Sequence, residues 1–200
     1  MTPANIQRLI IGISGASGVV YGIKLLELLA KTPVETHLVI SKAAEMTIAS
    51  ETDLKAKDVA ALADVTYPVN NVGAAIASGS FPSCGMIIAP CSIRTLGEIV
   101  TGVTTSLLTR AADVVLKERR TLALMVRETP LHTGHLRSMT AASEMGAIIT
   151  PPMPAFYTKP ETLGDIVHQS AARVLDLFDL NIGDTAGAKR WGIDVDLKAP

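Results

Sequence analysis

The chain has 200 residues, of which 48% are hydrophobic and 18% are charged, and its formal net charge is −1. A nearly neutral chain gives no reason to expect a nucleic acid or an anionic membrane surface as a partner. The length suits one α/β domain with a full core, so we expect residues 1–200 to form a single domain. The apolar fraction exceeds what one small domain can hide, which predicts burial between the subunits of a homo-oligomer.

Neither a membrane span nor a disulfide framework is expected. The longest uncharged run, residues 65–93, is interrupted by prolines, glycines and asparagines, so it does not predict a spanning helix. The first residues, MTPANIQRL, carry no signal-peptide pattern. Two cysteines, Cys84 and Cys91, are too few for a disulfide framework. These features favour a cytoplasmic protein.

The first predicted elements are a strand, a glycine-rich turn and a helix. Leu9–Ile13 is short, apolar and β-branched, which is typical of a buried strand in a parallel sheet. Gly12, Gly15 and Gly18 follow at three-residue spacing, and the apolar stripe over 19–29 predicts a helix. The glycines allow a ligand to approach closely, and the helix start offers unpaired N–H groups to an anion. Alternatively, the glycines only allow the helix to pack closely on the strand.

The next strand argues against a dinucleotide. The spacing G-x-x-G-x-x-G is neither the dinucleotide fingerprint nor a phosphate-binding P-loop. Glu35–Ile40 is the second predicted strand, and Ser41 and Lys42 follow it where a dinucleotide binder often carries an acid for the ribose. This favours flavin mononucleotide (FMN), or another phosphate ligand, over NAD.

The remaining elements continue the alternation of strands and helices. We expect strands over 85–89, 121–126 and 147–149, and helices over 43–50, 54–63, 107–116, 134–145 and 163–177. Residues 64–84 are expected to be irregular, and the serines at 78 and 80 either cap a turn or contact a ligand. The predicted fold class is therefore α/β: a single Rossmann-like (flavodoxin-like), doubly wound, mostly parallel sheet with helices on both faces.

Polar residues follow two predicted strands at their carboxyl ends, where open α/β sheets bind ligands. Ser92 follows the third strand, and its hydroxyl can cap the next helix or face a ligand. Arg127 and Glu128 follow the fourth strand, so the arginine can bind a phosphate and the carboxylate can shuttle a proton. Glu51, at the end of a predicted helix, is a further acid candidate.

Two other groups invite a chemical role. Cys91 could be a nucleophile, but no histidine is near it in sequence and buried cysteines are usually inert, so we favour packing. His132 and His135 lie three residues apart without a cysteine or acid at ligand spacing. This pair makes a poor zinc site, so we expect no metal.

Basic residues gather in one third of the chain. Arg110 and Lys117 are two helical turns apart, so both could contact one phosphate. Alternatively, they form a solvated helix face with their acidic neighbours. For Arg119 and Arg120 we expect the solvated face.

Several motifs along the chain together carry a resemblance. They are GISGASG (12–18), ISKAA (40–44), SETD (50–53), SGS (78–80), PCS (90–92), RAADVVLKER (110–119), RETPL (127–131) and PAFY (154–157). Over roughly residues 9–191, the chain resembles the UbiX/Pad flavin prenyltransferases, and its nearer branch is the bacterial UbiX type. This flavoprotein family is related to the flavin-dependent cysteine decarboxylases.

The resemblance implies a metal-independent transfer of a dimethylallyl group from dimethylallyl phosphate to N5 and C6 of reduced FMN, closing a fourth ring. The product, prenylated FMN, would serve a UbiD-type decarboxylase in ubiquinone biosynthesis or aromatic acid decarboxylation. The resemblance also implies a homododecamer whose sites lie between subunits. Departure of an allylic phosphate requires cations, a proton donor and a dry pocket.

The resemblance further assigns roles to residues. FMN would be held by Gly15, Ala16, Ser17, Ser41, Ser92, Ile93, Arg94, Thr95 and Arg127. The donor would be held by Ser78, Gly79, Arg110, Lys117, Tyr157, Arg173 and Trp191, with residues 180–200 as a tail that closes over the site. The catalytic residues would be Ser17 near flavin N5, Glu51 for proton transfer at the flavin and Glu128 for protons at the phosphate.

Two alternatives to a prenyltransferase stay open. The first is an FMN-dependent decarboxylase of the cysteine decarboxylase type, although those proteins carry Pro-Ala-Ser-Ala-Asn-Thr and Pro-x-Met-Asn segments where this chain has PCSIRT (90–95) and RETP (127–130). The second is a non-catalytic FMN carrier. A carrier would need the glycine turn but not Glu128, Tyr157 and Arg173.

Overall fold

One sheet organises the computed structural model, which we describe over residues 6–195. Within that range, six strands follow the order β3-β2-β1-β4-β5-β6, and each pairs in parallel with its neighbours. The strands are β1 (Arg8–Ile13), β2 (Glu35–Ile40), β3 (Val65–Tyr67), β4 (Gly85–Cys91), β5 (Thr121–Val126) and β6 (Ile148–Ile149). This is the Rossmann strand order, in which the winding of the chain reverses between β1 and β4.

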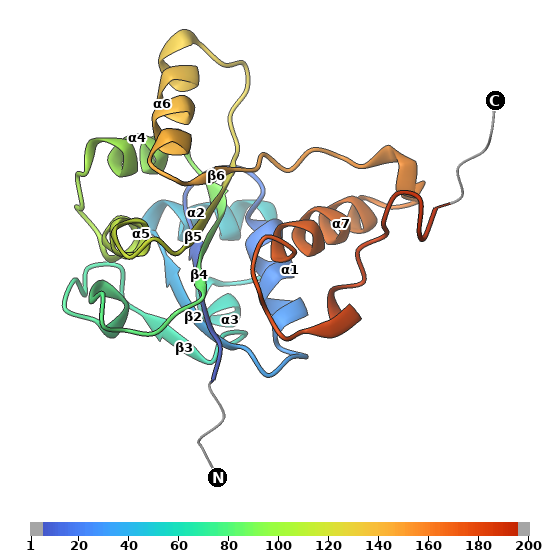
Figure 1. Ribbon diagram of the computed structural model, residues 1–200, viewed down its shortest axis with the longest axis horizontal. Coiled ribbons are helices and arrows are strands. Elements are labelled where there is room, and N and C mark those ends of the chain that lie inside the picture. Colours follow the sequence, from blue (N-terminus) through green and yellow to red (C-terminus); the bar gives the residue numbers. More distant parts are fainter. Residues whose placement is uncertain (1–5, 196–200) are drawn as a thin grey trace.

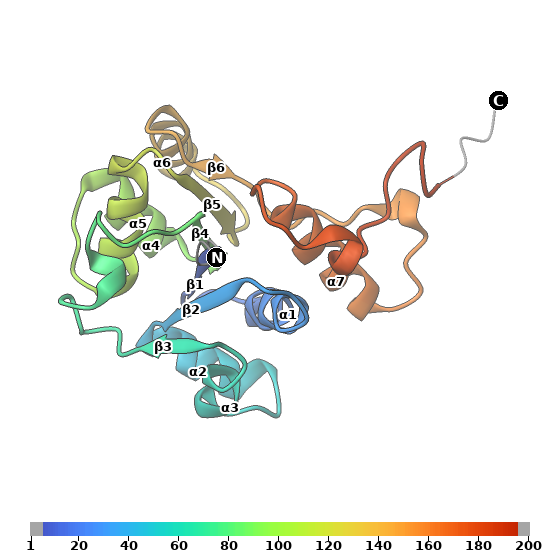
Figure 2. The ribbon, with the colours of Figure 1, turned by 60° about the horizontal axis from the view of Figure 1, so that its bottom comes forward.

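Helices cover both faces of the sheet (Figures 1 and 2). One face carries α1 (Val19–Leu29), α2 (Lys42–Glu51), α3 (Ala56–Ala60) and α7 (Leu163–Leu175). The other carries α4 (Ile93–Thr101), α5 (Leu107–Lys117) and α6 (Thr133–Glu144). Short 3-10 turns are η1 (Ala75–Ala77), η2 (Phe156–Thr158) and η3 (Gly183–Ala186). The predicted doubly wound α/β fold is confirmed.

The central strand shows how the sequence builds two cores. Side chains of a strand alternate between the faces of its sheet. In β1, Leu9, Ile11 and Ile13 pack with α1 and α7, whereas Ile10 packs with α4 and α5. These four side chains are almost completely buried. A strand covered on both faces must be apolar throughout, which is why β1 could be predicted from its sequence.

Some boundaries differ from those predicted. β3 was not expected, and it is a three-residue edge strand that pairs with β2 from His37–Val65 to Val39–Tyr67. Thr66 on this strand is exposed, so the segment carries no clear apolar pattern. The helix predicted over 54–63 is shorter, and β4 continues to Cys91. Among the described residues, no helix is long and apolar enough to cross a bilayer.

Glycines in the first strand–helix unit allow close packing. A Cβ atom on Gly22 of α1 would lie 2.3 Å from the carbonyl oxygen of Ala89 in β4. A Cβ atom on Gly15 would lie 2.3 Å from the Cβ atom of Ala43. Both distances are far below a normal contact, so Gly22 allows α1 to pack closely on β4, and Gly15 allows the turn after β1 to approach the start of α2.

We expect two helical glycines to respond oppositely to alanine. Gly22→Ala forces α1 away from β4 and should lower the free energy of unfolding by about 2 kcal/mol, as overpacking does. Gly97→Ala in α4 should raise it by about 0.5 kcal/mol, because alanine favours helices and no atom lies within 4 Å of the added Cβ. Urea unfolding at one protomer concentration measures both. Equal effects of the two substitutions would contradict this packing.

Candidate functional site

A cleft of about 530 Å³ lies along the carboxyl ends of the strands. Its walls come from the turns after β1, β2, β4 and β5, so it lies at the topological switch point of the sheet. The predicted residues that line it are Gly15, Ser41, Ser92, Ile93, Arg94, Thr95 and Glu128. A second recess of about 330 Å³ shares four of these residues and adds Ala16, Ser17 and Arg127. The structure therefore brings all nine residues predicted to hold FMN to one edge.

Two helices begin at this cleft with a serine cap. The Ser41 hydroxyl accepts a hydrogen bond from the Ala44 N–H at 3.1 Å, and α2 follows. The Ser92 hydroxyl accepts one from the Thr95 N–H at 3.2 Å, and α4 follows. A helix start carries a partial positive charge and N–H groups that lack helical partners. The cleft is therefore suited to an anion such as a phosphate.

Ser14 fastens the turn after β1 to the end of β4. Its hydroxyl donates to the Pro90 carbonyl at 2.8 Å and accepts from the Ser92 N–H at 2.7 Å. Only 1% of the side chain is exposed. From the sequence, the Ser14 hydroxyl was expected only as a polar group in the glycine turn, and its contacts with Pro90 and Ser92 were not predicted. Its hydroxyl fixes the position of the α4 start that opens on the cleft.

Glu51 has an unexpected partner at the start of α1. Its Oε2 accepts hydrogen bonds from the N–H groups of Gly18 at 2.8 Å and Val19 at 3.1 Å. The prediction that this helix start offers unpaired N–H groups is therefore wrong, because a carboxylate already binds there. The starts of α2 and α4 carry uncharged serine caps, so they remain the candidate positions for an anion at this edge.

Charged groups stand at the rim of the cleft. Arg127 donates from Nε to the Ser17 carbonyl at 3.1 Å, and Glu128 accepts from the Thr129 N–H at 3.0 Å. Arg94 pairs with Glu98 at 2.9 Å, and its side chain is 83% exposed. Because these side chains are exposed, they can turn toward a ligand with little loss of stability.

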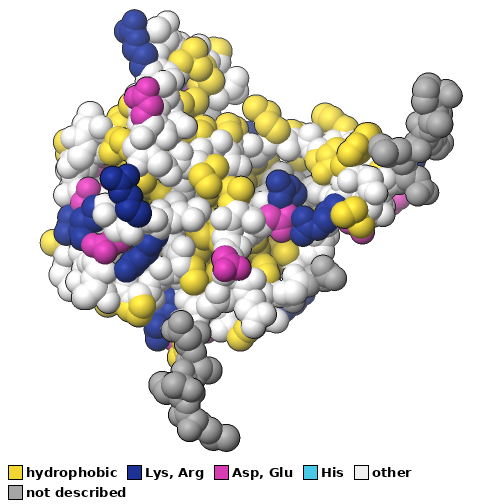
Figure 3. Space-filling view, viewed as in Figure 1, with side chains coloured by type: hydrophobic (Ala, Val, Ile, Leu, Met, Phe, Trp, Pro, Cys, Tyr) yellow, Lys and Arg dark blue, Asp and Glu magenta, His cyan; other side chains and the backbone are white. Residues whose placement is uncertain are grey.

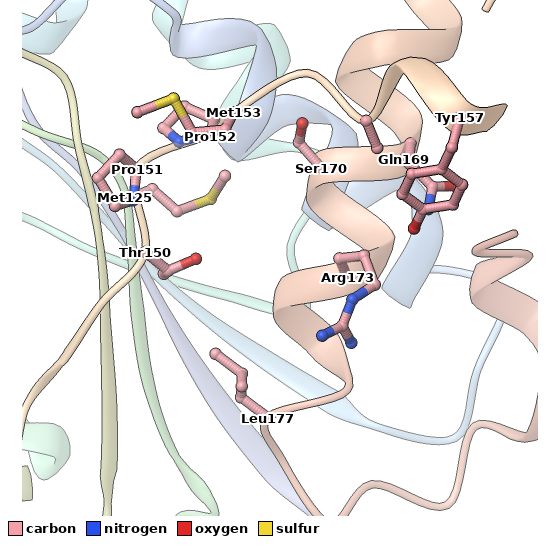
Figure 4. A pocket seen from close by; sticks show the side chains of 11 residues that line it. Met125, Thr150, Pro151, Pro152, Met153, Tyr157, Gln169, Ser170, Arg173 and Leu177 are labelled. Atoms are coloured by element: carbon pink, nitrogen blue, oxygen red, sulfur yellow. The ribbon is translucent and has the colours of Figure 1, made fainter. Parts of the chain in front are cut away.

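A groove of about 260 Å³ lies between β5 and α7 (Figure 4). Arg173 projects from α7 into this space, and Tyr157 comes from η2. Met125 of β5 lines the groove two residues before Arg127. The groove and the cleft are therefore neighbours along the same strand.

Asp176 binds two arginines beside the groove. It pairs with Arg173 and, through both oxygens, with Arg190 at 2.9 and 3.1 Å. Partial burial disfavours the carboxylate, but the hydrogen bonds from Arg190 and Arg173 outweigh it and lower the pKa of Asp176. Arg173 is thus held beside the groove by a carboxylate that stays ionised at neutral pH.

Trp191 contacts the groove through Tyr157. The two rings meet edge to face, with centroids 5.3 Å apart and an interplanar angle of 85°. Trp191 is 60% exposed. The structure therefore brings Tyr157, Arg173 and Trp191 to one region, while the predicted tail extends in part beyond the described residues.

Four predicted donor residues lie elsewhere in the protomer. None of Ser78, Gly79, Arg110 and Lys117 lines the cleft or the groove described above. Because α5 runs antiparallel to the strands, its last residue, Lys117, lies at the edge opposite the cleft. There a Cβ atom on Gly79 would lie 2.6 Å from the Lys117 Nζ.

Acidic neighbours partner the cations of α5. Arg110 pairs with Asp113 at 2.6 Å, and Lys117 pairs with Glu118. These pairs agree with the alternative interpretation, in which Arg110 and Lys117 lie on a helix face together with acidic neighbours. For Arg120, the prediction of a solvated side chain is wrong. Its guanidinium donates to the carbonyls of Phe81 at 2.6 Å and Gly79 at 2.9 Å, which fixes the loop that carries Gly79.

Cysteine and histidine take structural roles. Cys91 is fully buried, and burial raises the pKa of its thiol to about 12, so it packs as expected and is no nucleophile. The His132 Nδ1 accepts from the Gly134 N–H at 3.0 Å and caps α6. Across residues 6–195, no group of three histidine, cysteine or acidic side chains could hold a metal.

Comparison with known proteins identifies the family. Residues 2–175 match the model of the Flavoprotein family. The flavin prenyltransferase UbiX of Salmonella typhimurium is 59% identical over 175 residues, which cover 87% of this chain and 93% of the relative. The chain belongs to the UbiX flavin prenyltransferase family. The resemblance seen in the sequence is thereby confirmed.

Solved structures agree with this assignment. AnUbiX (PadA1), in complex with FMN and dimethylallyl pyrophosphate, is 48% identical with a TM-score of 0.90, and the match covers 94% of this chain and 98% of that one. A dodecameric FMN-dependent UbiX-like decarboxylase from Escherichia coli O157:H7 is 52% identical with a TM-score of 0.88, covering 92% and 99%. Both matches extend over nearly the whole of each chain.

Hydrophobic side chains are exposed on the outer surface of this family member. Figure 3 shows them over the projecting helix α6 and in the band between the sheet and α7. Large exposed apolar residues in these parts of the chain include Leu131, Leu136, Met145, Met153, Phe156 and Leu163. Only Ala142 of α6 is buried. So large an apolar area is typical of a surface that contacts another protein.

We expect Glu51→Gln to weaken the start of α1. The amide can still accept a hydrogen bond, but the negative charge beside the positive helix end is lost, which should lower the free energy of unfolding by about 1 kcal/mol. Glu144→Gln, at the exposed last residue of α6 and away from any helix start, is the control and should change it by less than about 0.5 kcal/mol. Denaturant unfolding measures both, and equal values would show that the Glu51 contacts contribute nothing to stability.

Proposed function

We propose that this protein transfers a dimethylallyl group from dimethylallyl phosphate to N5 and C6 of reduced FMN. Family membership supports the reaction class. The observation that carries the proposal is the cleft with two serine-capped helix starts, beside a groove that presents Arg173 and Tyr157. The cleft suits a flavin phosphate, and the groove suits the phosphate of a second substrate.

The cleft residues fit FMN by their chemistry. Ser41, Ser92 and Thr95 place hydroxyl groups at the starts of α2 and α4, where a phosphate gains from the helix dipoles. Ser17 and Arg127 border the adjoining recess, where we place the flavin ring. When bound and reduced, the flavin supplies the nucleophilic nitrogen and carbon of the reaction. The related AnUbiX was crystallised with FMN, which supports this assignment.

The groove residues would stabilise the departing phosphate. The Arg173 guanidinium can bind phosphate oxygens at two points, and the Tyr157 hydroxyl can donate a further hydrogen bond. Glu128 follows β5 and lines both the cleft and the adjoining recess, and we assign it the proton transfer at the phosphate. Glu51 orders the Ser17 turn through the Gly18 N–H, and any proton transfer by Glu51 would first require release of that contact.

A second copy of the chain would complete the donor site. Arg110, Lys117, Ser78 and Gly79 lie outside the cleft and the groove of their own protomer, so we propose that they serve a site formed with a neighbouring subunit. The exposed apolar surface and the dodecamer of the Escherichia coli relative support a homo-oligomer of that size. We place the enzyme in the cytoplasm, with a UbiD-type decarboxylase as the recipient of prenylated FMN.

Mass spectrometry of the flavin tests the proposed reaction. Purified protein, reduced FMN and dimethylallyl phosphate under strict anaerobiosis should yield a flavin heavier by one C5 unit. Dimethylallyl pyrophosphate, which AnUbiX was crystallised with, is the parallel donor to compare. An FMN carrier or a decarboxylase would return the flavin with its mass unchanged for either donor, and that result would contradict the proposal.

We expect Glu128→Gln to separate flavin binding from turnover. The amide cannot take up or deliver the proton at the phosphate, so kcat should fall by about 100-fold or more, while the FMN dissociation constant stays within about twofold. Glu144→Gln at the exposed end of α6 serves as the control. Flavin titration and single-turnover rates measure the two quantities. Full activity of Glu128→Gln would exclude its proposed proton role.

A further inference from the structure

Gln169 of α7 is a buried polar residue outside the set proposed to bind FMN or the donor. Its side chain is 5% exposed. The amide nitrogen donates to the Lys189 carbonyl at 2.9 Å, and the amide oxygen accepts from the Lys189 N–H at 3.0 Å. One side chain therefore satisfies both backbone groups of a residue 20 positions away. Since a buried amide is costly unless it is paired, this double contact is specific.

The contact docks the segment after η3 along α7. The Lys189 Nζ donates to the Thr158 carbonyl at 3.2 Å, so the same residue also reaches η2. Two residues later, Trp191 meets Tyr157 edge to face. The double hydrogen bond to Gln169 thus fixes the chain immediately before the aromatic pair.

Gln169 also belongs to the groove. It lines the same cavity as Tyr157 and Arg173, and Figure 4 shows it beside Tyr157, one helical turn from Arg173. Residues four apart lie on one face of a helix, so Gln169 and Arg173 face the same space. The residue that docks the C-terminal segment is therefore part of the wall that would bind the donor phosphate.

We propose that Gln169 is a positioning residue for the donor groove: its amide docks residues 186–191 on α7 and so holds Trp191 against Tyr157. When the two hydrogen bonds between Gln169 and Lys189 are formed, Trp191 and Tyr157 have a fixed position relative to Arg173. Without these hydrogen bonds, the segment keeps the Arg190–Asp176 pair but loses the contact that fixes the Lys189 backbone, so Trp191 is no longer held in one place against Tyr157. The consequence for donor binding rests on the proposed function, whereas the docking itself does not.

The only other glutamine of the chain, Gln7, offers a matched control. Gln7 makes the same kind of double contact, donating to the Asp179 carbonyl and accepting from the Asn181 N–H, both at 2.6 Å. It holds the chain just after α7, and it does not line the groove. Gln7→Leu therefore removes equivalent hydrogen bonds without touching Trp191 or Tyr157.

Trp191 is the only tryptophan of the chain, so indole fluorescence reports directly on docking. We expect Gln169→Leu to lower the fluorescence anisotropy of the full-length, flavin-free protein by about half, because a released segment moves on the nanosecond timescale. Gln169→Asn, whose amide is one methylene too short to reach both groups, should act in the same direction. Gln7→Leu should leave the anisotropy unchanged.

A second measurement, of the KM for the donor, uses the anaerobic transfer assay. For Gln169→Leu and Gln169→Asn, the KM for dimethylallyl phosphate should rise about tenfold, as expected when buried hydrogen bonds that order a site are lost. The FMN dissociation constant should stay within about twofold, which also shows that the variants are folded. Gln7→Leu should keep the wild-type KM.

The results separate the two proposals. Unchanged anisotropy in both Gln169 variants overturns the docking by Gln169. Lowered anisotropy with an unchanged KM overturns the positioning role. Equal effects of Gln7→Leu and Gln169→Leu on KM would assign the effect to general destabilisation and overturn the positioning role. A wild-type protein that transfers no C5 unit contradicts the proposed function instead, and this is established before any variant is compared.

Discussion

The parallel pairing of β1 with β4 is the constraint on which the site depends. The chain leaves β1 toward α1 on one face of the sheet and leaves β4 toward α4 on the other, so a gap opens between the two departing turns. Ser14 spans the base of this gap with hydrogen bonds to Pro90 and Ser92. A ligand at this edge therefore contacts backbone whose position is set by the core beneath it, not by flexible loops.

The elements that could be predicted from the sequence are those whose pattern lies within one short segment of the chain. β1, α1 and β5 have apolar patterns that match their burial, and Ser92 was recognisable as a residue that can begin a helix. The residues that sequence reasoning missed act across long separations. Glu51 reaches a helix start 33 positions earlier, and Gln169 reaches Lys189. No spacing rule encodes such contacts, because the fold alone brings the partners together.

The cations proposed to bind phosphates are already paired within the protomer. Arg94 pairs with Glu98, Lys117 with Glu118, and Arg173 with Asp176. The cation of each pair is about half exposed or more, so it can turn from its carboxylate toward a phosphate at the protein surface. The acidic neighbours keep each cation near its working position and limit the repulsion that unpaired like charges would produce. The same pairing explains how a chain of net charge −1 can present several arginines to an anion.

The direction of α5 relates the proposed donor site to the association of subunits. The helix starts beside the cleft, where Ser106 and Thr109 line the wall, and it ends at the opposite edge, where Lys117 meets the Gly79 loop. An eleven-residue helix spans about 16 Å at 1.5 Å per residue, which is too far for side chains at both ends to contact one phosphate. If both ends serve the same chemistry, they must do so in two different sites, and each site then needs a second copy of the chain. On the proposed function, loss of assembly would therefore weaken donor binding more than flavin binding, because the cleft proposed for the flavin is built from turns of one protomer.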